Sequence, residues 1–423
     1  MSAPRMTMKP LMSLDDALAE LLGAAVTLEG VESISTFEAD GRVLAQDLVA
    51  ALQVPPEDNS SMDGYAVRCT DVAQALRESL SGVAELALSQ RIAAGSSGAP
   101  LAPASVARIF TGAPIPLGAD AVVMQEDCEV LTSETASTRV RIKAVPEPGQ
   151  WLRRAGEDIR QGARVLAKGE RLAPAELGLA ASIGMDFLPV ARRPRVALFS
   201  TGDELVMPGA VPPEQMKPGA IYNSNRFFLR ALLLRLGCAV SDLGIVPDRL
   251  DASVQALRAA AQNHDLILTS GGVSVGEEDH IKPAVQSLGS LDLWQIAIKP
   301  GKPFAYGRVQ SAHFIGLPGN PVSSFVTFLL LVRPFLLKLQ GATQVTMKSS
   351  AASAHFTWAK VDKRREFLRV RRNGAGGLDL FPNQSSAVLT SAVWADGLVD
   401  NPPGRTIAVG DVVRFIPFSE LLA

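Results

Sequence analysis

Apolar runs of strand length alternate with amphipathic helical segments between residues 193 and 340 of this 423-residue chain. The runs RVALFS, CAVSDLGIV and DLILTS are separated by the helical segments NRFFLRALLLRLG and LDASVQALRAAAQN, and the strands DLWQIAI and AHFIGL lead into the long helix PVSSFVTFLLLVRPFLLKL. Such alternation predicts parallel strands joined by right-handed crossovers, with helices on both faces of the sheet. We therefore expect a doubly wound α/β domain over residues 193–340.

The rest of the chain has different patterns. Short apolar runs between Gly, Pro and Ser clusters predict an inserted, mostly-β domain at residues 48–150, and short strands separated by turn residues predict a small C-terminal β-barrel or sandwich at 341–423. Residues 1–47 and 151–192 flank the insertion and are expected to form an extended N-terminal α+β domain, which begins with a helix at 13–28. The expected fold class is multidomain α/β plus β.

Composition argues against several classes of function. The 41 basic and 43 acidic residues leave a net charge of -2, so neither nucleic acid nor a membrane surface is an expected partner. The three cysteines are too far apart for a CxxC motif, and we expect no disulfide framework. The N-terminus lacks the apolar core of a signal peptide, and Arg333 and Pro334 interrupt the most apolar stretch, so we expect a cytoplasmic location.

Small, polar or charged residues follow each of the five strands predicted within residues 193–340. In an open α/β sheet, ligands bind outside the carboxyl ends of the strands. In strand order, these residues are Thr201, Gly202, Asp203 and Glu204; Pro247 and Asp248; Ser270, Gly271, Gly272 and Asp279; Lys299, Pro300, Gly301, Lys302 and Pro303; and Pro318, Gly319, Asn320 and Pro321. We expect them to gather at one edge of the sheet.

The third of these strand ends, SGGVSVGEED at residues 270–279, combines glycines with acids. The glycines would let backbone N–H groups approach an anion, and Lys299 and Lys302 would neutralise it. The carboxylates at this edge repel phosphate unless a cation lies between, and Mg²⁺ prefers a few carboxylates together with phosphate oxygens. The pattern therefore predicts a phosphate ligand and a metal ion together. Each acid alone is also consistent with a helix cap, and SGG alone with an ordinary turn.

Two polar loops precede this domain. PPEDNSSMDGYAV contains Asp63, and RRAGEDI places Arg153 and Arg154 beside Glu157 and Asp158. The first loop is also consistent with a hairpin turn, because Asp-Gly is a common turn dipeptide, and the second with surface ion pairs. On the residues alone, each loop could be functional or merely structural. We interpret a third segment, RIFTGAPIPLGADAVVMQED, as structural.

Eight motifs occur in the order found in one known family. They are DNSSMDGYAV, RIFTGAPIPLGADAVVMQED, RRAGEDI, STGDEL, YNSN, TSGGVSVGEED, IKPGKPFAYG and GLPGNPVSS. From about residue 11 to its C-terminus the chain thus resembles the MoeA family of molybdopterin molybdenumtransferases, which is related to the E domain of gephyrin. The resemblance implies an enzyme of molybdenum cofactor biosynthesis that inserts molybdenum from molybdate into adenylylated molybdopterin and releases AMP, with Mg²⁺ assisting.

The resemblance also implies an assembly and residue roles. Family members are homodimers whose MogA-like α/β domain shares an active site with the second domain of the partner subunit, and a MogA-like adenylyltransferase and molybdoenzyme-maturation proteins are further expected partners. Glu204 and Asp279 would hold the Mg²⁺. By position, catalytic roles fall on Asp63, Asp158, Glu204, Asp248, Asp279 and Lys299, and substrate-binding roles on Thr201, Gly202, Asp203, Ser270, Gly271, Gly272, Lys302, Pro318, Gly319, Asn320, Pro321 and Ser391.

One position departs from the family, and two other functions stay open. Many relatives have a lysine where this chain has Gln295, so a positive contact to the ligand or molybdate is missing unless Arg153 or Arg154 replaces it.

A molybdopterin adenylyltransferase would share the SGG loop, although the extra domains disfavour it. A gephyrin-like scaffold without catalysis is disfavoured because no G domain or long linker accompanies the motifs. The sequence does not decide between molybdenum and tungsten.

Overall fold

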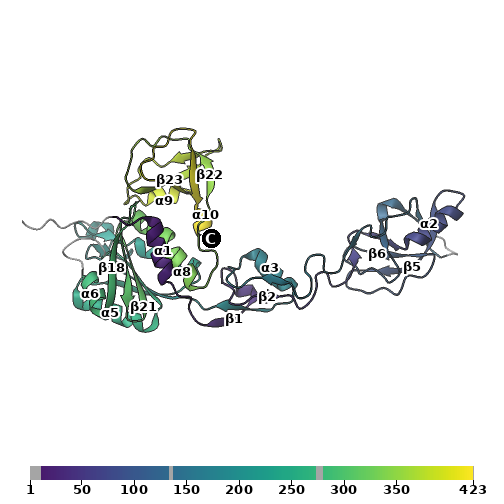
Figure 1. Ribbon diagram of the computed structural model, residues 1–423, viewed down its shortest axis with the longest axis horizontal. Coiled ribbons are helices and arrows are strands. Elements are labelled where there is room, and N and C mark those ends of the chain that lie inside the picture. Colours follow the sequence, from purple (N-terminus) through teal and green to yellow (C-terminus); the bar gives the residue numbers. More distant parts are fainter. Residues whose placement is uncertain (1–10, 133–136, 273–279, 423) are drawn as a thin grey trace, which may run out of the picture. The chain divides into compact units, whose positions relative to one another are not determined.

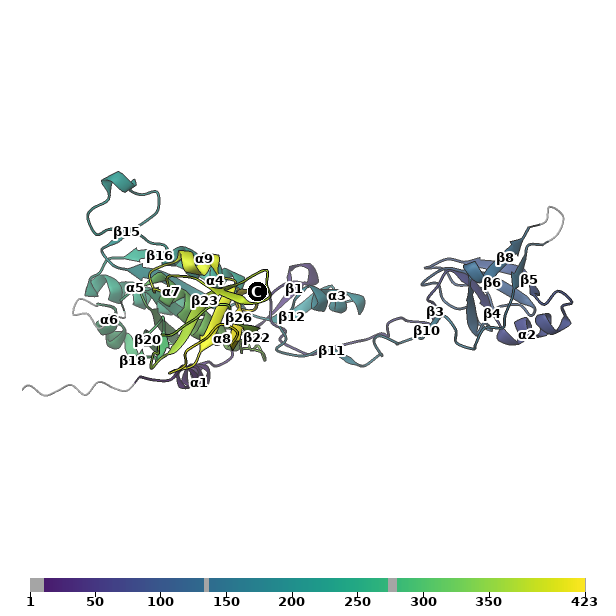
Figure 2. The same cartoon turned by 90° about the horizontal axis from the view of Figure 1, so that it is seen from above.

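The computed structural model describes residues 11–132, 137–272 and 280–422. The chain forms two compact units, which Figures 1 and 2 show from two directions. Unit 1 comprises Met1–Gln46, Lys168–Ala173 and Phe187–Ala423, and unit 2 comprises Asp47–Ala167 and Pro174–Asp186. Unit 1 therefore contains both the α/β segment and the C-terminal strands, and the finer domain boundaries stay predictions.

A six-stranded sheet forms the centre of the α/β segment. Its order is β16 (Ala239–Val246), β13 (Arg195–Thr201), β17 (Leu266–Ser270), β21 (Ala312–Leu317), β20 (Pro303–Val309) and β18 (Gly289–Gln295). The first four strands are parallel as predicted, but β20 runs antiparallel to both β21 and β18. The expectation of parallel strands throughout is wrong at this edge, because only Gln310 and Ser311 join β20 to β21 and so short a connection reverses the chain.

Helices cover both faces of this sheet. On one face lie α1 (Leu14–Ala24), α4 (Asn225–Arg235), α7 (Pro321–Thr327) and α8 (Arg333–Leu339), and on the other lie α5 (Leu250–Asn263) and α6 (Ile281–Leu288). Val196 and Leu198 of β13 belong to the first core, whereas Ala197 and Phe199 belong to the second. The alternation of side chains along a strand thus supplies two cores from one sheet.

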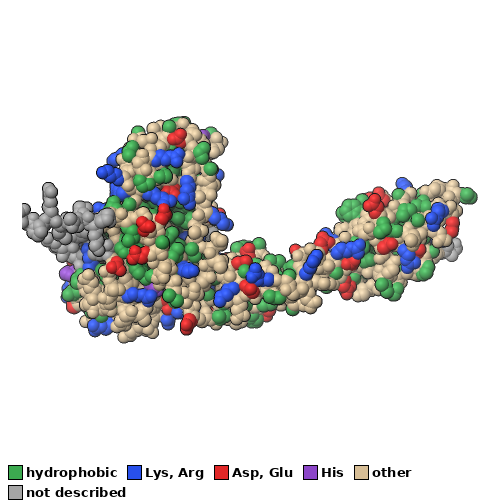
Figure 3. All heavy atoms as spheres, viewed as in Figure 1, with side chains coloured by type: hydrophobic (Ala, Val, Ile, Leu, Met, Phe, Trp, Pro, Cys, Tyr) green, Lys and Arg blue, Asp and Glu red, His purple; other side chains and the backbone are tan. Residues whose placement is uncertain are grey.

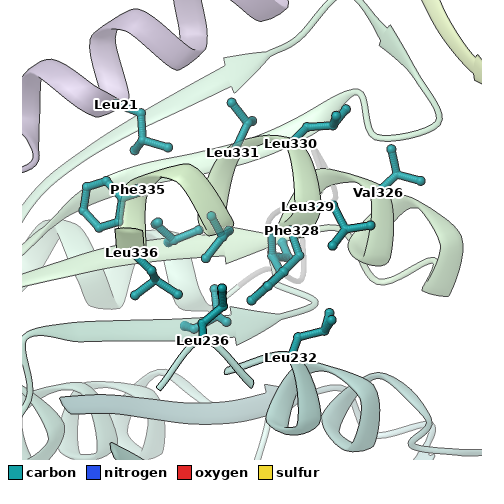
Figure 4. Close-up of a cluster of buried hydrophobic side chains, with 14 of the residues drawn as sticks. Leu21, Leu232, Leu236, Val326, Phe328, Leu329, Leu330, Leu331, Phe335 and Leu336 are labelled. Carbon is teal, nitrogen blue, oxygen red and sulfur yellow. The ribbon is translucent and has the colours of Figure 1, made fainter. Parts of the chain in front are cut away.

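The helical segment from Pro321 to Leu339 continues through a π-helical turn, Phe328–Val332, between α7 and α8. By length and composition alone it could cross a membrane, but 89% of its 18-residue apolar window is buried inside the structure, as in a core helix. Figure 4 shows Phe328 and Phe335 in the cluster that also receives Leu232 and Leu236. Burying each such side chain contributes about 1.5–3 kcal/mol, so this segment organises the larger core.

The C-terminal residues form a second sheet in unit 1. Its order is β19 (Ile298–Lys299), β23 (Arg365–Arg372), β25 (Gly397–Asn401), β26 (Val412–Pro417) and β22 (Ser350–Ser353), with β24 (Leu378–Leu380) also paired to β23. Ala354, which follows β22, forms a bridge with Leu378 of β24. This bridge joins the β22 edge of the sheet to β24, around a core that includes Phe356 and Phe415. The short helices α9 (Thr390–Trp394) and α10 (Phe418–Leu422) complete this part. Its first strand, β19, comes from the α/β segment.

Unit 1 also contains the short parallel pair β14 (Leu205–Val206) with β15 (Ile221–Tyr222) and the single 3-10 turn Pro213–Gln215. A further feature of unit 1 is a short antiparallel ribbon. It pairs β1 (Val31–Ser35) with β12 (Phe187–Ala191), and the single turn of 3-10 helix Thr36–Glu38 follows β1. The preceding helix, α1, begins where predicted, since the Ser13 hydroxyl accepts the N–H of Asp16, but it ends at Ala24 rather than at residue 28.

Unit 2 is mostly β, in agreement with the pattern of short apolar runs. Its main sheet has the order β7 (Ala121–Met124), β4 (Gly64–Val67), β6 (Ser105–Ile109), β5 (Ala84–Ile92), β9 (Arg139–Ile142) and β8 (Cys128–Leu131). Unit 2 also contains α2 (Cys69–Glu78), the 3-10 turn Gln125–Asp127, α3 (Pro174–Ser182), and the pairs β2 (Leu48–Val49) with β11 (Arg164–Leu166) and β3 (Asn59–Ser60) with β10 (Leu152–Arg153). Figure 3 shows acidic and basic side chains interspersed on the visible surface, as the balanced composition implies.

Candidate functional site

A cavity of about 770 Å³ opens at the carboxyl ends of β13, β17 and β21. The structure brings residues from all five predicted strand ends to it, although the fourth contributes only Pro303. The strand-end residues in its lining are Thr201, Gly202, Glu204, Asp248, Ser270, Gly271, Gly272, Pro303, Pro318, Gly319, Asn320 and Pro321. Tyr222, Asn223, Ser224 and Asn225 before and at the start of α4, and Ala387 from the C-terminal part, also line it.

The glycine pair after β17 has conformations that other residues avoid. Gly271 has φ +91° and Gly272 has φ +70°. A Cβ on Gly271 would lie 2.8 Å from the Thr201 carbonyl oxygen, and one on Gly272 would lie 2.6 Å from a side-chain carbon of Ile281. Glycine is thus required for the loop to pack against the end of β13 and the start of α6. Because the two glycines have no side chains, a ligand phosphate can come close to the backbone of this loop.

Asn225 forms hydrogen bonds to two walls of the cavity. Its side chain is only 8% exposed, and its amide Nδ2 donates to Ser270 Oγ at 2.8 Å and to the Gly319 carbonyl at 2.7 Å. The first bond fixes the end of β17 and the second fixes the loop before α7. Asn225 is therefore a component of the site as well as the first residue of a helix.

The predicted acids at this edge separate into two places. Glu204 and Asp248 line the main cavity. Asp203 instead lines a neighbouring cavity of about 540 Å³, beneath the loop that contains Lys217, and Glu204 lies between the two. Asp279 lies outside the described residues. Within the described residues, no group of three or more His, Cys, Asp or Glu side chains could hold a metal ion.

The two predicted lysines do not belong to the described lining of the cavity. The Lys299 ammonium lies 2.9 Å from Glu366 Oε1 and 3.5 Å from Asp362 Oδ2, both in the C-terminal part of unit 1. Lys302 is half-buried, and its carbonyl accepts the N–H of Ile296. The positive charge of Lys299 is thus already paired with carboxylates.

Ser391 is buried behind the cavity wall rather than exposed in it. Its hydroxyl donates to the Val388 carbonyl at 2.7 Å and accepts from Arg369 Nε at 3.1 Å. Arg369 also donates to the carbonyl of Ser385, and burial lowers the pKa of its guanidinium to about 10. The loop held in this way contributes Ala387 to the cavity.

The remaining predicted residues lie in unit 2. Asp63 is exposed, and its Oδ1 accepts the N–H and the hydroxyl of Thr111, both at 2.8 Å. The hydrogen bond from the Thr111 N–H is the main cause that lowers the pKa of Asp63, and the Thr111 hydroxyl adds to it. The Arg154 guanidinium pairs with Asp58 at 2.6 Å, while Asp158 is exposed. Asp63 and Thr111 thus form a polar pair that is held together by two hydrogen bonds.

Sequence reasoning missed two of these residues. Thr111 belongs to the TGAP segment that we interpret as structural, although a hydroxyl side chain at a strand end, beside a turn with Gly and Pro, is a signal for a polar site. For Asn225 the sequence alone predicts only a cap of the helix that follows. The signal for it was the second asparagine of YNSN, which lies at the carboxyl edge where the other strand-end residues gather.

Taken together, the fold and this cavity define an α/β protein with a candidate ligand site at the carboxyl edge of its sheet, where open α/β folds bind their ligands. The glycine loop provides close backbone approach, and two carboxylates in the same cavity provide oxygen donors for a cation.

Comparison with known proteins identifies the family. Residues 12–184 match the MoeA N-terminal region (domains I and II), 197–338 match a probable molybdopterin binding domain, and 351–418 match the MoeA C-terminal region (domain IV). The molybdopterin molybdenumtransferase of Haemophilus influenzae is 38% identical over 97% of this chain and 100% of its own length, and that of Synechococcus elongatus is 37% identical over 96% and 99%. The chain belongs to the MoeA family, as the motif series indicated.

Solved structures have the same fold. A molybdopterin biosynthesis MoeA protein from Pyrococcus horikoshii superimposes with a TM-score of 0.82 at 27% identity, and the match covers 96% of this chain and 100% of that one. A second structure from the same organism gives a TM-score of 0.76 at 30% identity over 97% and 99% of the two chains.

Proposed function

We propose that this chain is a molybdopterin molybdenumtransferase, a transferase of molybdenum cofactor biosynthesis that inserts molybdenum from molybdate into adenylylated molybdopterin and releases AMP. The observation that carries the proposal is the cavity at the carboxyl edge of the sheet, which is lined by Gly271 and Gly272 together with Glu204 and Asp248. Apart from Ala387, its lining lies within the segment that matches a molybdopterin binding domain. The curated relatives, which match nearly the whole chain, carry this activity in their names.

The charges in the cavity support a requirement for Mg²⁺. Glu204 and Asp248 offer the carboxylate oxygens that Mg²⁺ prefers, but too few for a site made of protein alone. Pyrophosphate oxygens of the substrate and water would complete the shell, with Asp279 as a further ligand predicted from the sequence. When bound there, Mg²⁺ would offset the negative charge of the pyrophosphate and of the departing AMP.

Molybdate is an anion, and its site requires cationic or N–H donors. Gln295 supplies no charge, and the charge of Arg154 is already paired with Asp58. Arg153 is exposed beside it, and Arg369 is buried with three neutral oxygens as its hydrogen-bond partners. We propose these two arginines as the sources of positive charge for molybdate, ahead of Arg154.

The functional molecule is proposed to be a cytoplasmic homodimer in which Asp63, Thr111 and Asp158 of one subunit complete the cavity of the other. Exposed apolar side chains support the dimer. Phe37 is 94% exposed, and Phe187 and Val31 on the β1–β12 ribbon are 54% and 56% exposed. A surface of this kind is typical of a protein–protein interface. The division into four parts, at 1–47 with 151–192, 48–150, 193–340 and 341–423, belongs to the same proposal.

Reconstitution tests the activity. The purified protein is mixed with adenylylated molybdopterin, Mg²⁺ and molybdate, and AMP release is followed with the wild type and with Glu204→Ala. We expect molybdate-dependent AMP release by the wild type and its loss in the folded variant. Equal release by both would count against the site. ATP consumption without the adenylylated substrate would indicate the adenylyltransferase instead, and parallel reactions with tungstate would establish the metal preference.

A further inference from the structure

The segment that leads into α4 forms one wall of the main cavity. Asn223, Ser224 and Asn225 all line the cavity. The pairing of β14 with β15 holds this segment in place, since the N–H of Asn223 also donates to the Val206 carbonyl at 2.9 Å. Asn223 is only 2% exposed. Backbone pairing and burial therefore fix the polar groups of this wall.

The side chain of Asn223 has a hydrogen-bond donor that is not used. Its Oδ1 accepts the N–H of Arg226 at 3.3 Å, which places the oxygen toward the first turn of α4 and the Nδ2 group on the other side of the amide. Within the residues that the structure describes, this buried Nδ2 group has no hydrogen-bond partner. Buried polar groups are normally paired. Because Asn223 lines the cavity, an acceptor atom of a ligand is the partner that the site can provide.

The N-terminus of α4 adds further donors to the same wall. The helix has eleven residues and no acid in its first turn, and in the described chain the side chain of its N-cap, Ser224, makes no capping hydrogen bond. The charge of Arg226 is paired with Asp242 at 2.6 Å. The first N–H groups of a helix lack partners inside it and carry partial positive charge. This end of α4 therefore favours an anion, and the Ser224 hydroxyl can donate to it.

We propose that the start of α4 is a phosphate subsite of the cavity. Asn223 Nδ2, the Ser224 hydroxyl and the backbone at the helix terminus donate to one phosphate group of the substrate's pyrophosphate, while the loop with Gly272 binds the other. The subsite rests on the proposed function, which supplies a substrate with two linked phosphates. Its neutral donors add to the charge of the metal ion in offsetting the repulsion from Glu204 and Asp248, which line the same cavity.

Calorimetric titration of the substrate-free protein with inorganic pyrophosphate and Mg²⁺ tests the subsite without turnover. Asn223→Asp keeps an oxygen for the N–H of Arg226 but replaces the buried donor with a carboxylate oxygen, and Ser224→Ala removes only a hydroxyl. We expect Kd to rise more than about tenfold in Asn223→Asp and about three- to tenfold in Ser224→Ala. Both variants should unfold at the wild-type urea midpoint, because the bond to Arg226 is kept and Ser224 caps nothing.

Gln215→Glu is the matched control for charge. It also converts an amide to a carboxylate, but Gln215 is exposed and lines the neighbouring cavity instead of the wall at α4. We expect this variant to bind pyrophosphate within about twofold of the wild type, because it leaves every donor at the start of α4 in place.

The proposal is overturned if Asn223→Asp and Ser224→Ala both bind pyrophosphate as tightly as the wild type. An equal rise of Kd in Gln215→Glu and Asn223→Asp would also overturn it, since net charge alone would then explain the effect. A wild-type protein that binds pyrophosphate but releases no AMP would contradict the proposed function instead, and the comparison of the variants would still decide whether the subsite exists.

Discussion

Gly271 and Gly272 show how the requirements of a site are met at the level of single residues. Both have positive φ, and neither has room for a Cβ against Thr201 and Ile281. The sequence indicated a glycine turn after a strand, but the contact with the end of β13 depends on packing between distant segments. The choice of glycine was therefore predictable, whereas its physical reason was not.

We predict that Gly271→Ala destabilises the fold and the site together. Alanine at φ +91° is strained, and its Cβ would lie 2.8 Å from the Thr201 carbonyl oxygen, so the free energy of unfolding should fall by about 2 kcal/mol or more. Urea denaturation measures this. Gly319→Ala is the control for stability, since no heavy atom lies within 4 Å of its added Cβ. Equal stability of the two variants would contradict the packing argument.

At the scale of elements, local patterns predicted much and long-range pairing little. The alternation of strands and helices predicted β13, β16, β17 and β21 with their crossovers. It did not predict that β19 pairs with β23, more than sixty residues further along the chain, because nothing in either segment encodes that partner. The same limit explains why Lys299 was expected beside phosphate and is found beside Glu366.

The packing of β21 against α8 makes stability depend on pH. His313 of β21 is buried, its Nδ1 lies 2.9 Å from the Tyr306 hydroxyl, and its ring meets that of Phe335 edge-on. Burial, with a smaller contribution from the charge of Arg308, lowers the pKa of His313 from 6.5 to about 4. The folded state therefore keeps the imidazole neutral where the unfolded state binds a proton.

Proton linkage gives the direction in which pH changes the free energy of unfolding. Stability from the neutral histidine is complete above pH 6.5 and is lost as pH falls from 6.5 towards about 4, by on the order of 2–3 kcal/mol. We predict that His313→Phe, whatever its stability at pH 7, loses less stability than the wild type between pH 7 and pH 5. Urea unfolding at the two pH values tests this, and parallel losses in both proteins would contradict it.

At the scale of the whole molecule, the chain has two compact units and carries predicted site residues in both of them. The main cavity belongs to unit 1, whereas Asp63, Thr111 and Asp158 belong to unit 2. Sequence motifs identified both groups of residues apart from Thr111, but an assembly that joins them across two copies requires a surface for association. The exposed Phe37, next to the β1–β12 ribbon, provides a way to test it.

We predict that Phe37→Asp converts a homodimer to monomers and abolishes AMP release. Because Phe37 is 94% exposed, the change places a charge in the proposed interface without removing packing inside the subunit. Light scattering after gel filtration measures the mass. Leu80→Asp changes a fully exposed leucine of unit 2 and should leave the dimer intact. A monomeric wild type, or a dimer that persists in Phe37→Asp, would contradict the assembly.

The central claim is that the carboxyl edge of the sheet holds the pyrophosphate of an adenylylated pterin. A crystal structure with that compound and Mg²⁺ tests it most directly. We predict that the pyrophosphate lies within hydrogen-bonding distance of the Gly272 N–H, since the Gly271 N–H donates to the Leu317 carbonyl, with the metal ion between it and Glu204. A ligand bound elsewhere, or in this cavity with its phosphates turned away from the glycines and the carboxylate, would contradict the account.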